Sequence, residues 1–329
     1  MTPVIDYILD LELFNLQNVN THMNPNRITP IALAALVAVA VSCGPRDNPT
    51  PQAPQEPVNN SVVSPPPDAP DDAAFDAHVK DVESRAPEGF TVVPEPPFVV
   101  IGDETPAQVA SRARGTVRWT VKMLRQDFFK KDPSEIIDIW LFKDDASYRH
   151  HAQALFGDEP DTPFGYYSAV DRALVMNIST GGGTLVHELV HPFMRANFPE
   201  CPAWFDEGMG SLYEQSAGRG GHIVGLTNWR LAGLKQAITG GEVPSFEILT
   251  STTDIQFYDR DPGTNYGQAR YLCLYLQENG LLVPYYHEFV ANHDGDPTGY
   301  KTLMRVLDVK DMSRFKDEWE SWVMNLSFP

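Results

Sequence analysis

The spacing of apolar residues changes near residue 180. Before it, short runs of β-branched and aromatic residues predict strands, at 98–101, 136–142, 165–170 and 173–178. Asp171-Arg172 between the last two runs predicts a hairpin turn. Helical spacing surrounds these strands, at 72–85, 105–129 and 144–156.

Three glycines at 181–183 break the chain, and helical spacing dominates afterwards. The predicted helices are 184–197, 203–216, 226–239, 265–279, 283–293 and 311–325. Strands first and helices later predict an α+β fold, in which a small N-terminal β-sheet with helices precedes a mainly helical C-terminal part.

An uncharged apolar run lies near the N-terminus. Residues 23–27 end in a basic residue, 28–41 are mostly Ala, Val and Leu, and Ser42 and Cys43 follow. This pattern is typical of a secretory signal peptide, and the run is too short to span a membrane comfortably. The cysteine after it resembles a bacterial lipoprotein box. The alternative is a cytoplasmic protein with an apolar helix.

The resemblance implies a protein of the bacterial cell envelope, periplasmic or surface-facing, whose one membrane contact is a lipid anchor at Cys43. The acidic residues within 1–22 do not suit a signal, so translation is expected to begin at Met23 and 1–22 to be a mis-assigned extension. Residues 44–70 are rich in proline and predict a disordered linker. The folded domain is then 71–329.

Charge and cysteine content limit the kinds of partner and metal site that the chain can have. The net charge of -19 excludes a nucleic-acid partner, because phosphate binding needs a basic surface. None of the three cysteines forms a C-x-x-C pair, which disfavours a cysteine zinc site. Cys201 and Cys273 could form a disulfide in an exported protein or remain two buried thiols. We expect a monomer.

One short motif carries most of the chemistry. His187-Glu188-Leu189-Val190-His191 places two histidines four residues apart, so on a helix both imidazoles can reach one ion. Glu188 is then positioned to take a proton from a metal-bound water. The apolar neighbours bury the helix on one side, and buried histidines need partners. A metal site is therefore favoured over a helix with two surface histidines.

A catalytic zinc takes three protein ligands and keeps an open position. No third histidine closely follows His191, so the acidic candidate is Glu207, in an apolar helix opening where a carboxylate is costly without a cation. Gly208 and Gly210 weaken that helix and predict close packing against the helix of His187. We expect one Zn²⁺ ion held by His187, His191 and Glu207.

Two further segments resemble gluzincin aminopeptidases. Residues 204–211, W-F-D-E-G-M-G-S, resemble the family's W-L-N-E-G-F-A-S stretch, which implies that Glu207 is the third zinc ligand. Residues 266–272 resemble its Y-x-K-G-x-x-x-L helix, which implies that Tyr266 stabilises the oxyanion. Over roughly residues 95–290 the layout is similar to compact bacterial peptidase-MA-like proteins.

The chain departs from that family in two ways. The connection between His191 and Glu207 is shorter than in the aminopeptidases. Their G-x-M-E-N glutamate, which binds a free amine, is missing from the comparable segment 174–178, so endopeptidase action is favoured over aminopeptidase action. That segment is still expected to pair with an extended substrate.

Other polar residues have two interpretations each. Asp206 and Glu214 are partners of the ligand histidines or solvated acids. Arg270 recognises a carboxylate or is a surface charge. His222 is a loop histidine and the next candidate for the oxyanion donor after Tyr266. Four other histidines are interpreted as surface residues, at 150, 151, 287 and 293.

These patterns predict a zinc metallopeptidase that hydrolyses peptide or protein substrates, with Glu188 as general base and Tyr266 as a catalytic donor. The alternative is a non-catalytic envelope lipoprotein that uses the gluzincin scaffold for binding. The intact Glu188 disfavours the alternative, because a binding protein has no need of the base.

Overall fold

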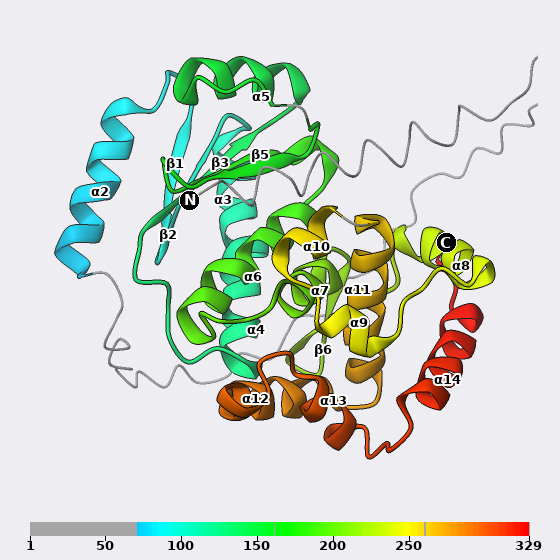
Figure 1. Ribbon diagram of the computed structural model, residues 1–329. Helices are drawn as coiled ribbons and strands as arrows, with labels where there is room; N and C mark the ends of the chain where they lie inside the picture. Colours follow the sequence, from blue (N-terminus) through cyan, green and yellow to red (C-terminus); the bar gives the residue numbers. More distant parts are fainter. Residues whose placement is uncertain (1–70, 161, 260, 329) are drawn as a thin grey trace, which may run out of the picture.

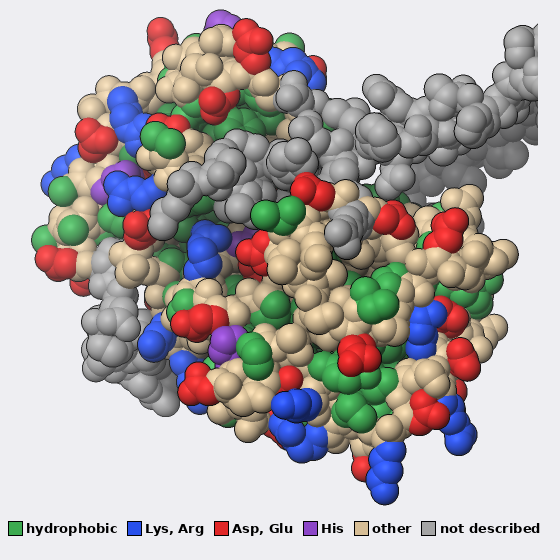
Figure 2. Space-filling model, in the orientation of Figure 1, with side chains coloured by type: hydrophobic (Ala, Val, Ile, Leu, Met, Phe, Trp, Pro, Cys, Tyr) green, Lys and Arg blue, Asp and Glu red, His purple; other side chains and the backbone are tan. Residues whose placement is uncertain are grey.

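The computed structural model describes residues 71–160, 162–259 and 261–328. The predicted signal segment, the anchor at Cys43 and the linker lie outside the described residues. Within them, no helix combines the length and the apolar character needed to cross a membrane. On the face drawn in Figure 2, basic side chains lie scattered among acidic ones.

A five-stranded mixed sheet forms the N-terminal half (Figure 1). Its spatial order is β1-β2-β3-β5-β4, with β2, β3 and β5 parallel and the two outer strands antiparallel to their neighbours. The strands are β1 (Thr91–Glu95), β2 (Phe98–Gly102), β3 (Ile137–Phe142), β4 (Gly165–Ser168) and β5 (Ala173–Asn177). The predicted α+β class and the hairpin, now β4 and β5, are confirmed.

The helices of this half cover both faces of the sheet (Figure 1). They are α2 (Asp72–Arg85), α3 (Pro106–Arg112), the π-helical η1 (Ala113–Arg118), α4 (Trp119–Asp127), α5 (Asp145–His151), the π-helical η2 (Ala152–Phe156) and the short η3 (Ile178–Thr180). Alternate side chains of each strand enter different cores, as the pleat requires. Val99 and Trp140 pack with α2 and α5, whereas Val100 and Leu141 pack with the helices of the opposite face.

The C-terminal half is mostly helical. Its elements are α6 (Gly183–Asn197), α7 (Ala203–Tyr213), β6 (Ser216–Arg219), β7 (His222–Gly225), α8 (Arg230–Gly240), α9 (Phe246–Thr250), α10 (Asp254–Asp259), α11 (Pro262–Glu278), α12 (Leu282–Asn292), η4 (His293–Gly295), α13 (Tyr300–Val306) and α14 (Met312–Asn325). All six predicted helices are present. Two of their ends differ: α7 ends at Tyr213, before the small β6-β7 hairpin that begins at Ser216, and α8 begins only at Arg230.

The prediction that segment 174–178 pairs with substrate is wrong for β5. This strand is bonded to β3 on one side and to β4 on the other, so its backbone groups are already paired along 173–176. The tight hairpin is the cause, because it lays β4 over the edge that an extended peptide would need. The strand at that end of the sheet is β4.

Candidate metal centre

The two histidines lie on α6, whose start is fixed by close packing. A Cβ atom at Gly183 would collide with the carbonyl oxygen of Glu214 at the end of α7, so only glycine fits there. The helix continues through Pro192 to its end. His187 and His191 therefore stay on one face, both buried, with their ring centroids 4.9 Å apart.

Glu207 on α7 completes the group. Its carboxylate is 1% exposed, and its Oε2 atom lies 3.2 Å from Nε2 of His187 and 3.9 Å from Nε2 of His191. One ligand atom from each of the three residues falls within 4.8 Å of the others. A group of two imidazoles and one carboxylate in this arrangement could bind a metal ion, as predicted from the sequence.

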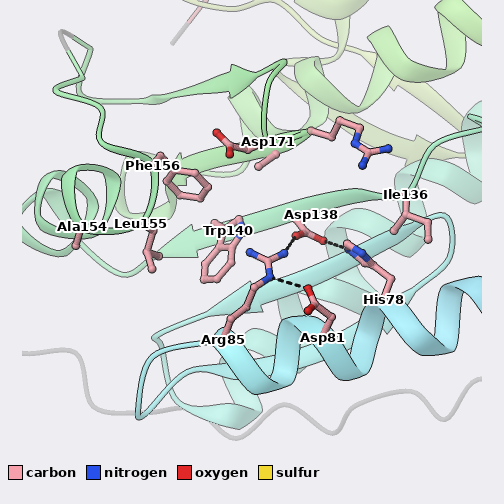
Figure 3. A pocket seen from close by; sticks show the side chains of 12 residues that line it. His78, Asp81, Arg85, Ile136, Asp138, Trp140, Ala154, Leu155, Phe156 and Asp171 are labelled. Carbon is pink, nitrogen blue, oxygen red and sulfur yellow. Dashed lines mark hydrogen bonds and ion pairs between the residues drawn. The ribbon is translucent and has the colours of Figure 1, made fainter.

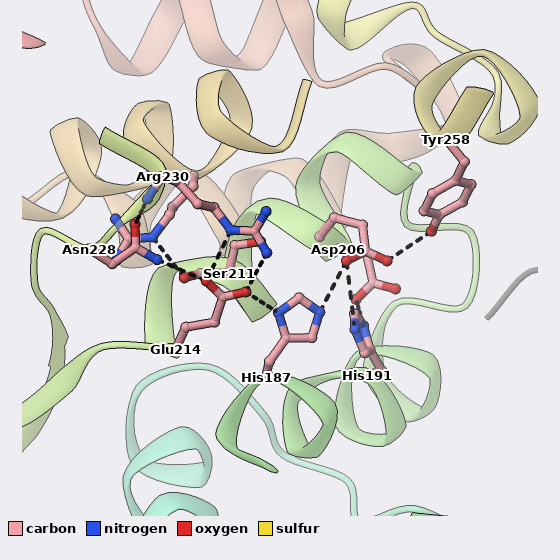
Figure 4. Close-up of polar contacts among 10 residues, drawn as sticks. His187, His191, Asp206, Ser211, Glu214, Asn228, Arg230 and Tyr258 are labelled. Atoms are coloured by element: carbon pink, nitrogen blue, oxygen red, sulfur yellow. Dashed lines mark hydrogen bonds and ion pairs between the residues drawn. The ribbon is translucent and has the colours of Figure 1, made fainter. Parts of the chain in front are cut away.

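The second ring nitrogen of each histidine faces a carboxylate (Figure 4). Nδ1 of His187 lies 3.2 Å from Oε1 of Glu214, and Nδ1 of His191 lies 2.9 Å from Oδ1 of Asp206. Such contacts fix the orientation of a ligand ring and leave Nε2 for the metal. Of the two interpretations, the partner role therefore holds for Asp206 and Glu214, and a surface role for Glu214 is wrong.

Glu214 is itself held in place from α8 and the segment before it (Figure 4). Arg230 donates to both of its carboxylate oxygens, over 3.1 and 2.8 Å, and the Asn228 amide donates over 2.8 Å. Burial opposes the charge of Glu214, but Arg230 and His187 together hold the pKa of this carboxyl well below its usual range. Sequence reasoning missed both donors, because no local pattern links them to a carboxylate on α7.

The centre attracts positive charge. Burial by itself lowers the pKa of His187, but the carboxylates of Glu207 and Glu214 outweigh it and raise that pKa well above 6.5. Asp206 and Glu207 likewise raise the pKa of His191. Burial also works against the charge of Glu207, and the two histidines nevertheless lower its pKa. A metal cation supplies the same compensating charge as protons on the rings do.

Glu188 differs from the other carboxylates of the centre. It is 3% exposed, yet among the described residues its carboxylate makes no hydrogen bond or ion pair. Burial raises its pKa, while the neighbouring histidines lower it less strongly. The carboxylate of Glu188 therefore lies beside the group that could bind a metal without being bonded to it.

The side chains of two tyrosines lie close to Glu207 in the candidate metal centre. The hydroxyl of Tyr258, on α10, donates to Oε1 of Glu207 over 2.8 Å, a contact that sequence reasoning missed (Figure 4). Tyr266, on α11, has a buried hydroxyl without a hydrogen-bond partner in the described chain. Burial and the nearby carboxylate of Glu207 raise its pKa well above the ordinary value. The structure thus brings Tyr266 to the centre, as the motif implied.

The two glycines of α7 face different neighbours. A Cβ atom at Gly210 would lie 3.1 Å from ring atoms of His187, which confirms the predicted close approach of the two helices. A Cβ atom at Gly208 would instead lie 3.0 Å from the sulfur of Cys273 on α11. Both Cys273 and Cys201 are free thiols.

The other singled-out residues lie elsewhere. His222 is exposed and bonds Oδ1 of Asp127, so it is not gathered with the metal-binding group. Arg270 is fully buried and donates to backbone carbonyls at the end of α7 and of Leu226. The surface-charge interpretation of Arg270 is wrong, because its guanidinium is buried and donates to these carbonyls.

No protein-family model and no curated protein matches this sequence. The interpretation of the centre therefore rests on its geometry and on the three short motifs.

Proposed function

We propose that this chain is a zinc-dependent metallopeptidase with endopeptidase action on peptide or protein substrates. One observation carries the proposal: His187, His191 and Glu207 converge within 4.8 Å, and the uncommitted carboxylate of Glu188 is buried on the same helix as the histidines. A protein that only binds a metal would need the three converging residues. It would have no use for the buried carboxylate of Glu188.

The donor set suits zinc. Two imidazole nitrogens and one carboxylate oxygen are a usual set for catalytic zinc, which keeps a further position open. When bound, zinc polarises a carbonyl and lowers the pKa of a water to about 7. Asp206 and Glu214 keep the two rings oriented for this role.

The chain's own groups would move the protons. Glu188 accepts the proton of the attacking water and passes it to the leaving amine, the work of a general base and then acid. The hydroxyl of Tyr266, which has no other described partner, donates to the carbonyl oxygen of the scissile bond as charge develops on it. Tyr258 instead holds Glu207 through its hydrogen bond.

Endopeptidase action is favoured because Asn177 stands where the aminopeptidases have the glutamate that binds a free amine. Its side chain is occupied by the carbonyl of Pro163 and by Ser179. No carboxylate is offered there to a free amino terminus. We also propose that the mature protein is anchored in the cell envelope through Cys43, on the sequence pattern of residues 23–43 alone.

Metal content and turnover, measured together, test the proposal. The wild-type protein should contain one zinc per chain and cleave members of a peptide library. Glu188→Gln should keep the zinc and lose at least about 10²-fold in kcat, the lower range for a general base. Glu200→Gln, at an exposed acid, serves as the matched control and should change neither quantity.

Three results would count against the proposal. A protein that contains no zinc and takes up none contradicts the metal site. A Glu188→Gln variant with unchanged kcat contradicts the role of the base. Stoichiometric zinc without cleavage of any peptide favours the binding lipoprotein instead.

A further inference from the structure

Arg195, near the end of α6, is a cation without a paired acid in the described chain. Its side chain is exposed, and its guanidinium lies 5.5 Å from the ring centre of Tyr167 on β4. Stacking on a ring uses the flat face of a guanidinium and leaves the N–H donors in its plane free. Because β4 is the outermost strand of the sheet, this contact joins α6 to an open sheet edge. An extended peptide that pairs with this edge would pass Arg195.

Arg195 also lies on the same face of α6 as Glu188, the proposed base. The two positions are separated by about two helical turns, which is about 10 Å along the helix. Burial raises the pKa of Glu188, the two histidines of the centre oppose this rise, and so does the charge of Arg195. Because about three residues of extended peptide span such a distance, a group bound at Arg195 would be about three residues from the bond that Glu188 acts on.

The central strands of the sheet offer Arg195 no acid. Asp138 is the one acid on the parallel strands β2, β3 and β5, and it is engaged on the opposite face of the sheet. There it lines a pocket of about 500 Å³, in which His78 contacts one of its carboxylate oxygens at 2.7 Å and Arg85 donates to the other (Figure 3). Asp138 therefore has donors of its own and does not balance the charge of Arg195.

Glu135, just before β3, is the acid whose charge reaches the same tyrosine. Burial raises the pKa of Tyr167, Arg195 opposes this rise, and Glu135 adds to it. Both charged side chains are exposed, yet they form no ion pair with each other among the residues that the structure describes. The N–H donors of Arg195 are therefore open to a carboxylate from outside the chain.

We propose that Arg195 binds a carboxylate of the peptide substrate and so selects an acidic residue about three positions from the scissile bond. The proposal rests on the proposed peptidase function. The guanidinium donates to both carboxylate oxygens, while the Tyr167 ring supports its face. The net charge of -19 repels acidic peptides in general, so such a preference needs a local cation. A structural role alone, in which Arg195 ties α6 to β4, gives no preference for an acidic substrate.

Paired peptides measure the preference. In a peptide that the protein cleaves, each residue near the scissile bond is replaced by Glu and, in a second series, by Gln. At one position the ratio of kcat/KM for Glu over Gln should be about 5 or more, the upper range for an exposed ion pair. Arg195→Gln should abolish this preference, Arg195→Glu should reverse it, and Arg195→Lys should retain part of it. Because Arg195 is exposed, these variants should fold as the wild type does.

Controls separate Arg195 from the general charge of the protein. Arg219→Gln removes the same charge from an exposed position on β6 and should keep the wild-type ratio. Glu135→Gln should not lower the ratio, because Glu135 competes with the substrate for Arg195 if it acts at all. Peptides that end at the preferred position, as free acid and as amide, identify the source of the carboxylate. A larger preference for acid over amide than for Glu over Gln assigns the terminal carboxylate instead of a side chain.

Cleavage without a carboxylate preference at any position overturns the proposal, and so does a preference that Arg195→Glu leaves unchanged. Both results leave the proposed peptidase function standing. If the wild-type protein cleaves no peptide, that function has failed, and binding tests Arg195 separately. Fluorescence anisotropy of fluorescein-labelled alanine peptides with a central Glu or Gln should then show tighter binding of the Glu peptide by about 5-fold or more. The same affinities in wild type and Arg195→Gln would overturn the proposal.

Discussion

A single methyl group at Gly210 tests the metal centre most directly. In Gly210→Ala, the new Cβ atom would lie 3.1 Å from Cδ2, Cε1 and Nε2 of the His187 ring. Carbon atoms in favourable contact are about 3.5–4.0 Å apart. The ring or the helix must therefore yield by a few tenths of an ångström to restore ordinary contact.

That displacement is large for a metal ligand. Metal–ligand distances in a sound site stay within about 0.2 Å of their ideal values, so the ring of His187 would leave its productive position. Disturbing the support of a ligand typically costs about 10- to 100-fold in metal affinity, or about 1.4–2.8 kcal/mol. The fold should survive, because alanine is favoured over glycine inside a helix by roughly 0.5–1 kcal/mol.

The measurement is a competition titration of zinc against a chromophoric chelator, together with chemical unfolding of the metal-free protein. Gly233→Ala is the matched control, because a Cβ atom there meets no heavy atom within 4 Å in the middle of α8. It should leave zinc affinity unchanged. Zinc binding by Gly210→Ala as tight as that of the wild type would refute the proposed geometry of His187.

Three other predictions follow from the same interpretation. Tyr266→Phe should lower kcat by about 10²–10³-fold with little change in KM, because its hydrogen bond forms mainly in the transition state; steady-state kinetics on one peptide checks this. Cys43→Ser should block processing and membrane fractionation, whereas mass spectrometry finding an unmodified residue 1 in soluble wild-type protein contradicts the anchor. Burial lowers the pKa of the His187 ring, but the carboxylates of Glu207 and Glu214 raise it more, so protons compete with a metal for this ring. Zinc binding should therefore release protons and weaken as the pH falls; calorimetry in two buffers of different ionisation heat measures the release, and none detected contradicts it.

The group of His187, His191 and Glu207, which could bind a metal ion, was predictable because each of its members leaves a local signal in the sequence. The four-residue spacing of His187 and His191 is the repeat of one helix face. Glu207 stands out as a carboxylate within an apolar helix opening, where it is costly without a cation. The structure places all three together, and adds that each histidine has a carboxylate on its other nitrogen.

Partners from distant segments were not predictable. Tyr258 reaches Glu207 from α10, a short helix that the apolar pattern did not indicate. Arg230 reaches Glu214 from the start of α8, and no sequence pattern near either residue predicts this contact. Arg270 was misread for the opposite reason: its position on a helix indicates a surface charge, but α11 is enclosed by neighbours on that side and the guanidinium serves backbone carbonyls.

The short connection between the histidine helix and the Glu207 helix favours a rigid centre. Only residues 198–202 separate α6 from α7. Phe198 within it is buried and packs edge-on against Phe289 of α12, with ring centroids 4.9 Å apart. On its other side α7 meets α11 through Gly208, which leaves no room for even a methyl group without a shift. Because the three residues that could bind a metal lie on helices whose separation is fixed at both ends, their side chains are positioned before any ion arrives, which the proposed catalysis requires.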